Sequence, residues 1–353
     1  MRNIREEDIN QIISRIPYKK CENKSFLITG ANGFLASYMV DTLMCLKKNG
    51  LVKNCSVIAL CRNKEKAKHI FARWLDQENF HLLIQAVEDK INCKDKIDYI
   101  IHAASCSATQ LFHSKPVDLM RANIIGCYNL LELAREKQTR GFLFFSSGAV
   151  YGDTDVNELL EDKTYILDYL NMKNSYAFGK RAGEALCRAY WQQYGVPAKG
   201  VRISHTYGPG INIDDGHVYS DFAKSIIEKS NIIIKSDGVA SRPFCYVSDA
   251  ICAFYLVLFY GDNGEMYNMA NSNQIVTIKE LADILTKNVF KERNLNVIVE
   301  KQAIMHNNYK TIVNTKKLEN LGWKPVIGIE EGFRRLIDSL EKDYAVERQR
   351  TRI

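Results

Sequence analysis

The sequence predicts an α/β fold: a doubly wound parallel sheet followed by a smaller C-terminal α/β region. Three observations predict it. Apolar segments of strand length alternate with helix-length segments from residue 25 to residue 204, a glycine-rich turn joins the first strand to the first helix, and loops rich in Gly, Asp and Ser separate short helices after residue 204. Continuous apolar strands between helices are typical of a parallel sheet that is covered on both faces. The 353 residues are enough for one large domain or two smaller ones.

The elements follow one another in a regular order. Residues 1–24 form an amphipathic helical extension, whose apolar face carries isoleucines and whose helix ends before Pro17. Strands are predicted at SFLIT (25–29), SVIALC (56–61), FHLLI (80–84), DYIIHAAS (98–105), GFLFFSS (141–147) and AKGVRIS (198–204). Helices are predicted at 33–48, 64–76, 117–137 and 175–194, and then at about 217–229, 248–260 and 277–290.

Composition excludes several classes of protein. The net charge of +7 is too low, and its lysines and arginines too scattered, for a nucleic-acid-binding surface, although it suits an anionic small molecule. The densest apolar run, at 250–260, is too short to span a membrane, and the polar N-terminus does not resemble a secretory signal. None of the ten cysteines forms a CxxC pair. We therefore expect a cytoplasmic protein with no membrane, nucleic-acid or metal partner.

The turn FLITGANGFLAS is predicted to bind a pyrophosphate. Gly30 and Gly33 allow the backbone to turn sharply, and the start of the following helix offers unpaired N–H groups to an anion. Ala36 supplies the small side chain that close packing of helix on strand requires. The predicted cofactor-binding residues at this turn are Gly30, Asn32, Gly33, Phe34 and Leu35. An ordinary strand-to-helix turn is the alternative.

Four further residues concern the dinucleotide. Arg62 stands where the second strand ends, a place at which a carboxylate would bind the ribose hydroxyls of NAD and a basic side chain would suit the 2′-phosphate of NADP. Arg62 therefore keeps NADP open beside NAD, and a solvated arginine is the alternative. Ala103 and Ala104 are small residues where a dinucleotide would pass, and Asn123 lies inside a helix as a cofactor contact or a plain buried amide.

The segment SYAFGKRAGE places Tyr176 and Lys180 four residues apart, on one face of a helix. A phenolate can take the proton of a sugar hydroxyl only if its pKa falls from about 10 toward neutrality. A neighbouring ammonium favours the phenolate. The hydroxyls of Ser146 and Ser147 end the strand before this helix, either as part of the site or simply as the end of the strand.

Together these motifs resemble the extended short-chain dehydrogenase/reductase family of nucleotide-sugar epimerases, 4,6-dehydratases and decarboxylases. The resemblance rests on TGxxGF, HAA, SSxxVYG and YxxxK in this order, and on RISHTYGPG, SRPFCYVSDA and LENLGWKP further on, over about residues 25–340. It implies a Rossmann-type sheet, a catalytic trio of Ser147, Tyr176 and Lys180, and contact of Lys180 with the nicotinamide ribose. It also implies a nucleotide-diphosphate sugar as substrate, a role in surface polysaccharide precursor synthesis and a homodimer formed through the helices at 117–137 and 175–194.

The resemblance also assigns the rest of the chain. It gives residues 25–204 to dinucleotide binding, residues 205–345 mainly to the substrate with one or two segments returning to the sheet, and residues 346–353 to a basic tail. Arg242 matches an arginine that clamps the substrate diphosphate, to which a guanidinium fork is suited. His205 stands where many relatives have Asn against sugar or phosphate, or is a buried core histidine. Ser147 would touch the substrate as well.

The residues after Ser147 separate the activities within this family. By resemblance, 4,6-dehydratases carry Asp-Glu there and UDP-glucuronate decarboxylases a Glu, whereas Gly148 and Ala149 cannot transfer a proton. A carboxylate could come from downstream, where the chain has Asp153, Asp155, Glu158, Glu161 and Asp162. The trio and the cofactor alone suffice for C4 epimerisation through a transient 4-keto sugar, which is the favoured function. The alternatives are a 4,6-dehydratase, a decarboxylase, a 4-ketoreductase, or a non-catalytic binding protein.

Overall fold

The computed structural model describes residues 3–105, 111–154, 156–304 and 311–350. Its centre is a seven-stranded parallel sheet with the strand order β12-β7-β5-β4-β1-β2-β3. The strands are β1 Lys24–Thr29, β2 Cys55–Cys61, β3 Phe80–Ile84, β4 Tyr99–His102, β5 Gly141–Ser147, β7 Ala198–Ile203 and β12 Met266–Met269. The strand order reverses its direction at β1, as in a doubly wound sheet, so the predicted fold class is confirmed.

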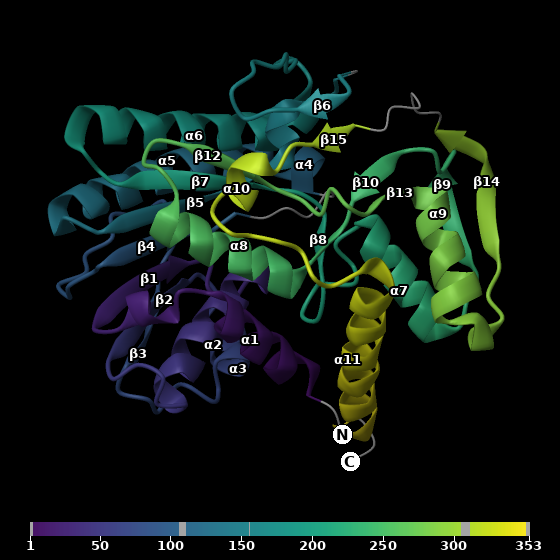
Figure 1. The fold of residues 1–353 in the computed structure, drawn as a ribbon, viewed down its shortest axis with the longest axis horizontal. Coiled ribbons are helices and arrows are strands. Elements are labelled where there is room, and N and C mark those ends of the chain that lie inside the picture. Colours follow the sequence, from purple (N-terminus) through teal and green to yellow (C-terminus); the bar gives the residue numbers. More distant parts are fainter. Residues whose placement is uncertain (1–2, 106–110, 155, 305–310, 351–353) are drawn as a thin grey trace.

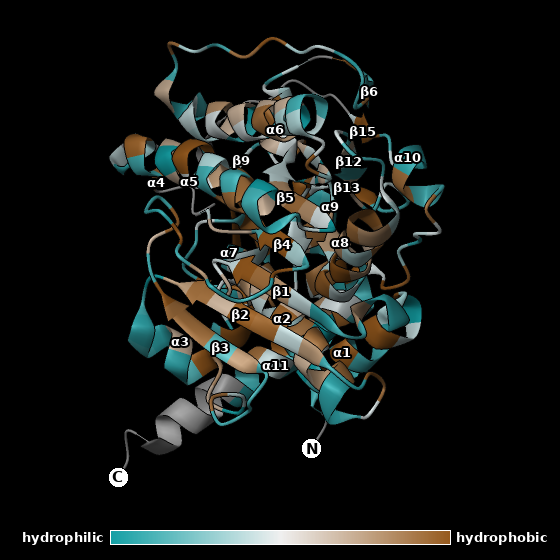
Figure 2. Cartoon of the chain, turned by 90° about the vertical axis from the view of Figure 1, so that its left-hand side faces the viewer, coloured by the Kyte–Doolittle hydropathy of each residue, from teal (hydrophilic) through white to brown (hydrophobic). Residues whose placement is uncertain are grey.

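Helices cover both faces of this sheet (Figure 1). The helices α2 (Phe34–Lys48) and α8 (Val247–Tyr260) pack on one face, and α5 (Pro116–Lys137) and α6 (Ser175–Tyr194) on the other. Successive residues of β5 alternate between the two hydrophobic clusters, because Phe142 and Phe144 belong to one cluster and Leu143 and Phe145 to the other. Figure 2 shows the strands as largely hydrophobic and the helices with hydrophilic outer faces.

The C-terminal region consists of helices and four two-stranded sheets. Its helices are α7 Val218–Glu228, α9 Ile278–Asp283, α10 Lys316–Glu319 and α11 Ile329–Arg350. Its strand pairs are β8 Thr206–Tyr207 with β11 Cys245–Tyr246, β9 Ile232–Ser236 with β14 Val297–Ile304, β10 Ser241–Pro243 with β13 Ile275–Thr277, and β6 Glu158–Leu159 with β15 Ile312–Val313. The pair β6–β15 joins the loop after β5 to the C-terminal region.

The N-terminal helix α1 (Ile4–Arg15) packs against α2, α8 and α11. Its Asp8 is fully buried and accepts hydrogen bonds from Tyr246 at 2.8 Å and Arg335 at 2.9 Å. Its Arg15 pairs with the buried Asp249 at 2.6 Å. These polar contacts therefore attach the N-terminal helix α1 to the C-terminal region. A short 3₁₀ helix, η1 (Tyr18–Cys21), follows Pro17.

Two predicted helices differ in the structure. Helix α3 spans Lys64–Ile70, and the predicted continuation to residue 76 is wrong because the chain turns there. These turns bury both Phe71 and Trp74, whose indole donates to Asp41 at 2.7 Å. The helix predicted at 277–290 is α9 followed by a π-helical stretch, Ile284–Val289 (η4).

The remaining short elements lie around the site and beside α9. They are α4 Leu111–Ser114 and the 3₁₀ helices η2 Gly148–Tyr151, η3 Met172–Asn174 and η5 Lys291–Arg293. Helix α11 runs to Arg350, so it includes most of the segment assigned to a basic tail. Within the described ranges, no helix has both the length and the apolar character that crossing a bilayer requires.

Candidate active site

The carboxyl ends of β1, β4, β5 and β7 open into one cleft with a volume of about 1460 Å³. Ligands of open α/β sheets bind at this edge, beside the point where the strand order reverses. The cleft is lined by ten of the residues singled out in the sequence: Gly30, Gly33, Phe34, Leu35, Ala103, Ser147, Tyr176, Lys180, His205 and Arg242. Four others, Asn32, Arg62, Ala104 and Asn123, do not line it.

The glycine turn fits a dinucleotide pyrophosphate. Gly30 has a φ of +60°, and a Cβ there would lie 2.7 Å from the Cα of Ala104, so only glycine lets the turn approach β4 this closely. Gly33 caps α2, whose first residues Phe34 and Leu35 line the cleft. The N–H groups of a first helical turn have no partner within the helix, and they attract anions.

A hydrogen-bonded chain fixes the ends of β1 and β4. The backbone N–H of Ala104 donates to Thr29 Oγ1 at 3.3 Å, and Thr29 Oγ1 lies 3.0 Å from His102 Nδ1. His102 Nε2 lies 3.1 Å from the carbonyl oxygen of Ala122 in α5, which is an acceptor only. His102 is therefore the neutral tautomer with its proton on Nε2. Burial and the nearby Lys180 lower the pKa of His102 to about 3.

Asn123 and Arg62 lie outside the cleft lining for different reasons. Asn123 is fully buried, and its Nδ2 donates to Leu119 O at 2.7 Å and to Ser105 Oγ at 3.1 Å. Its Oδ1 has no partner among the described residues. Asn123 thus connects α5 to the segment after β4, as a buried amide would. Arg62 follows β2 and is exposed.

Ser147, Tyr176 and Lys180 come together from two elements. Ser147 ends β5, and its Oγ accepts the N–H of Ala149 at 3.2 Å. Tyr176 and Lys180 lie in the first turns of α6, with Lys180 Nζ 5.6 Å from the centre of the Tyr176 ring. Lys180 is 3% exposed, and burial lowers its pKa to about 7. A phenolate at Tyr176 would favour the ammonium form of Lys180, and the ammonium would favour the phenolate.

Arg242 and two histidines, His205 and His217, also line the cleft. Arg242 ends in the cleft with Nη1 donating to the carbonyl oxygen of Ser241 at 2.8 Å. Burial, Arg242 and His217 lower the pKa of His205 to about 3, so His205 is a neutral hydrogen-bonding side chain. His217 stacks on Tyr219 with ring centres 5.1 Å apart, and both line the cleft. His217 and Tyr219 were not predicted from the sequence, because they stand at the start of α7, which carries no motif.

The carboxylates after Ser147 differ in their surroundings. Asp153 and Glu158 line the cleft, whereas Glu161 accepts the backbone N–H of Asn268 at 2.9 Å. Asp162 is exposed, and Asp155 lies outside the described residues. Ala149 also lines the cleft without offering a proton-transferring group. A Cβ at Gly148 would lie 3.1 Å from Ser204 Oγ, so little room is left for a larger side chain there.

Comparisons with known proteins agree with this geometry. The profile of the NAD dependent epimerase/dehydratase family matches residues 26–270. UDP-glucuronic acid decarboxylase 5 of Arabidopsis thaliana is 30% identical over 92% of this chain and 91% of its own length. dTDP-D-glucose 4,6-dehydratase of Mus musculus is 25% identical over 91% of this chain and 90% of its own length.

Solved structures share the fold. UDP-glucuronic acid 4-epimerase from Bacillus cereus, in complex with UDP-glucuronic acid and NAD, aligns with a TM-score of 0.75 and 20% identity, over 91% of this chain and all of that one. UDP-glucose 4-epimerase from Thermotoga maritima aligns with a TM-score of 0.73 and 24% identity, over 91% of this chain and 99% of that one. The chain therefore belongs to the NAD dependent epimerase/dehydratase family, as its motifs predicted, and is an NAD-dependent enzyme of the kind that modifies nucleotide sugars.

Proposed function

We propose that the protein is a nucleotide-sugar epimerase that inverts C4 through a transient 4-keto sugar. One observation carries the proposal. Ser147, Tyr176 and Lys180, which can oxidise and reduce a sugar together with the cofactor, line the cleft. The positions after Ser147, where elimination would need a carboxylate, hold Gly148 and Ala149. The guanidinium of Arg242, which lines the same cleft, suits a diphosphate.

In this proposal, each residue of the trio has its own role in the reaction. Bound NAD supplies the hydride acceptor and donor. Tyr176, as a phenolate, takes the proton of the sugar hydroxyl and returns it after the ketone has presented its other face, while Ser147 donates a hydrogen bond to the same oxygen. Lys180, as an ammonium, stabilises the phenolate. The cleft of about 1460 Å³ is large enough for a bound sugar to turn over.

A second candidate is decarboxylation of a nucleotide-linked uronic acid. Two observations support it: the relatives include UDP-glucuronic acid decarboxylases, and Asp153 and Glu158 stand on the cleft wall, where either could transfer a proton. Ala149 argues against it. A 4,6-dehydratase and a 4-ketoreductase remain as further outcomes of the same test.

The test is incubation of the purified protein and NAD with UDP-, dTDP-, GDP- and CDP-sugars, including UDP-glucuronic acid, followed by mass spectrometry and sugar analysis. We expect a product of unchanged mass with the inverted C4 configuration. Loss of water or of carbon dioxide would replace the epimerase with a dehydratase or decarboxylase. Reduction of an added 4-keto nucleotide sugar by NADH, with the other sugars unchanged, would indicate a ketoreductase, and no product from any sugar would overturn the proposed epimerase.

We also infer a cytoplasmic homodimer. Helix α5 carries a stripe of exposed apolar side chains, with Val117, Ile125 and Tyr128 exposed by 66%, 42% and 49%. A second copy packing on this face would cover them. The nine described cysteines are all free, which suits a reducing compartment. Light scattering should give twice the chain mass, and Ile125→Glu should lower it to that of one chain.

A further inference from the structure

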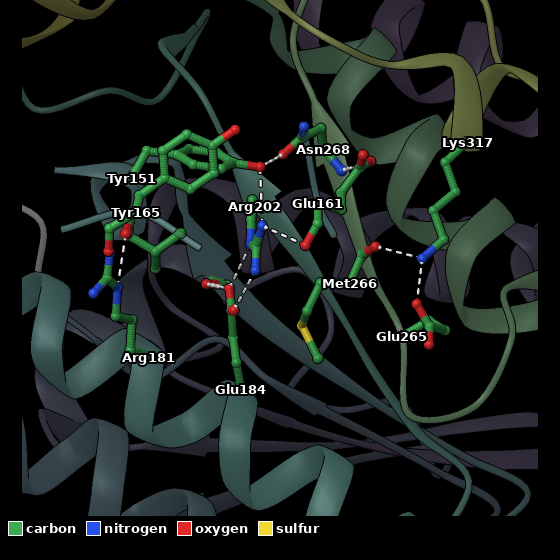
Figure 3. A network of polar contacts seen from close by, with 12 residues as sticks. Tyr151, Glu161, Tyr165, Arg181, Glu184, Arg202, Glu265, Met266, Asn268 and Lys317 are labelled. Carbon is green, nitrogen blue, oxygen red and sulfur yellow. Dashed lines mark hydrogen bonds and ion pairs between the residues drawn. The ribbon is translucent and has the colours of Figure 1, made fainter. Parts of the chain in front are cut away.

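Glu184 extends the line of Tyr176 and Lys180 along α6, because the three residues are spaced four apart. It is buried, and it accepts both branches of the Arg202 guanidinium (Figure 3). Arg202 Nε lies 3.0 Å from Glu184 Oε1, and Nη2 lies 2.8 Å from Oε2. Bidentate pairs of this kind fix orientation as well as distance.

The Glu184–Arg202 pair contacts the residue that precedes Ser147. Ser146 Oγ donates to Glu184 Oε1 at 2.5 Å, and Ser146 is also the residue opposite Arg202 in the pairing of β5 with β7. Since Ser147 is the next residue, the same contact fixes where its side chain leaves the strand. One carboxylate thus holds α6, which carries Tyr176 and Lys180, against the strand that carries Ser147.

The other end of Arg202 fixes the turn after Ser147. Its Nη1 lies 3.0 Å from Tyr151 Oη, and Tyr151 Oη donates to Asn268 Oδ1 in β12 at 2.5 Å. Arg181 of α6 donates to the carbonyl oxygen of Val150 in the same turn at 2.8 Å. Figure 3 shows these side chains meeting between α6, β7 and β12.

The charges of the pair also act on Lys180. The groups that face Lys180 are Cys127 of α5, His102 of β4, and Tyr176 and Glu184 of its own helix. Among these, Cys127 and, after it, Glu184 favour the ammonium form, and Arg202 compensates the charge of Glu184. Removing either partner alone would leave an uncompensated buried charge beside the site.

We propose that Glu184 and Arg202 are positioning residues that hold Ser147 in register with Tyr176 and Lys180. Through the balance of their two charges, they also set the pH at which Tyr176 exchanges its proton. The inference rests on the proposed function only in giving Ser147, Tyr176 and Lys180 their catalytic roles.

The experiment is a titration of Tyr176 in the protein saturated with NAD, followed by tyrosinate absorbance, with Tyr176→Phe subtracted. Glu184→Gln removes a negative charge and Arg202→Gln removes a positive one, so we expect the two midpoints to move in opposite directions from that of the wild type, by roughly 0.5–1 pH unit each. The double variant restores the charge balance, and its midpoint should return to that of the wild type.

Arg202→Lys is the matched control, since it keeps the positive charge and loses the bidentate contact with Glu184. Its midpoint should stay at the wild-type value while turnover falls. If Arg202→Gln does not fold, a shifted midpoint in Arg202→Lys would overturn the proposal on its own. Equal midpoints in all folded variants, or shifts in the same direction for both charge-removing variants, would also overturn it.

The titration needs no sugar, so the two proposals can fail separately. A Tyr176 transition that responds as expected in a protein that converts no nucleotide sugar overturns the proposed function alone. A transition that is insensitive to Glu184 and Arg202 overturns this inference alone. Absence of any Tyr176 transition below about pH 9.5, close to that of an ordinary tyrosine, overturns both.

Discussion

Lys180 Nζ donates a hydrogen bond to the backbone carbonyl oxygen of Phe145 at 2.5 Å. This contact joins α6 to β5 two residues before Ser147. The lysine is therefore held by the strand that carries the serine, and its ammonium group is removed from water in order to stand beside Tyr176. The proposed catalysis needs the charged form of Lys180, whereas burying that charge lowers the free energy of unfolding.

Lys180→Met should stabilise the fold while abolishing turnover. Burial lowers the pKa of Lys180 from 10.5 to about 7, so the unfolded chain binds more protons between these values. The resulting penalty is complete below pH 7 and fades as the pH rises toward 10.5. After allowance for the lost hydrogen bond, we expect a gain on the order of 2 kcal/mol in the free energy of unfolding in mild acid.

Urea unfolding of both proteins at several pH values measures this difference, which should shrink above neutrality. A Lys180→Met variant that is less stable than the wild type at every pH would contradict the buried-charge account. Thermal unfolding with and without NAD shows whether the fold and the cofactor site survive.

Tyr176→Phe should lower kcat by about 10²–10⁴-fold, because the ring stays in place while the proton acceptor is lost. NAD binding, followed by fluorescence or calorimetry, should change little. Ser147→Ala should reduce kcat less, since it removes one hydrogen bond to the reacting oxygen. A Tyr176→Phe protein with wild-type kcat would show that another group moves the proton.

Acid should destabilise the protein through two buried histidines. The pKa values of His102 and His205 are lowered from 6.5 to about 3, so the unfolded chain binds more protons between these limits. The free energy of unfolding should therefore fall as the pH drops from 6.5 toward 3, by up to about 1.4 kcal/mol per pH unit for each histidine.

His102→Gln keeps a donor and an acceptor for Ala122 and Thr29, and removes one titrating group. Its loss of stability with acid should be less steep than that of the wild type. Parallel slopes for the two proteins in urea titrations would mean that His102 already binds a proton in the folded state.

Gly183→Ala should destabilise the contact between α6 and β5. An added Cβ would lie 2.3 Å from Phe144 Cζ, closer than packed atoms can come, so the helix or the ring has to move. We expect a cost of about 1–3 kcal/mol, measured by urea unfolding. Phe144→Leu in the same chain should recover part of it, and a double-mutant cycle without coupling would place the cost elsewhere.

The sequence predicted the fold and the site where a regular spacing of residues or a backbone turn restricts which residue types can stand there. Six of the seven strands of the sheet were predicted, all but β12, and the bounds of α6 agree with the predicted 175–194. The glycine turn and the Tyr176–Lys180 pair were found because backbone geometry and helical spacing restrict the residue types. The strands after residue 204 are two to eight residues long and mostly too short for a periodic pattern.

The parts that could not be predicted depend on contacts between distant segments. His217 and Tyr219 line the cleft from the start of α7, which carries none of the motifs that predicted the rest of the site. The pairing of Glu184 with Arg202 joins a helix to a strand across the sheet, and neither residue differs in the sequence from a surface charge. Arg62 is exposed at the end of β2, and its contact with the dinucleotide stays a prediction.

The edge strand β12 has a consequence for how the chain folds during synthesis. Residues 266–269 pair with β7, so β7 is an open edge until this late segment has left the ribosome. At about 5–20 residues per second, the edge stays exposed for seconds. Unpaired strand edges recruit other chains, so truncation before residue 266 should yield an aggregating fragment and not a smaller working domain.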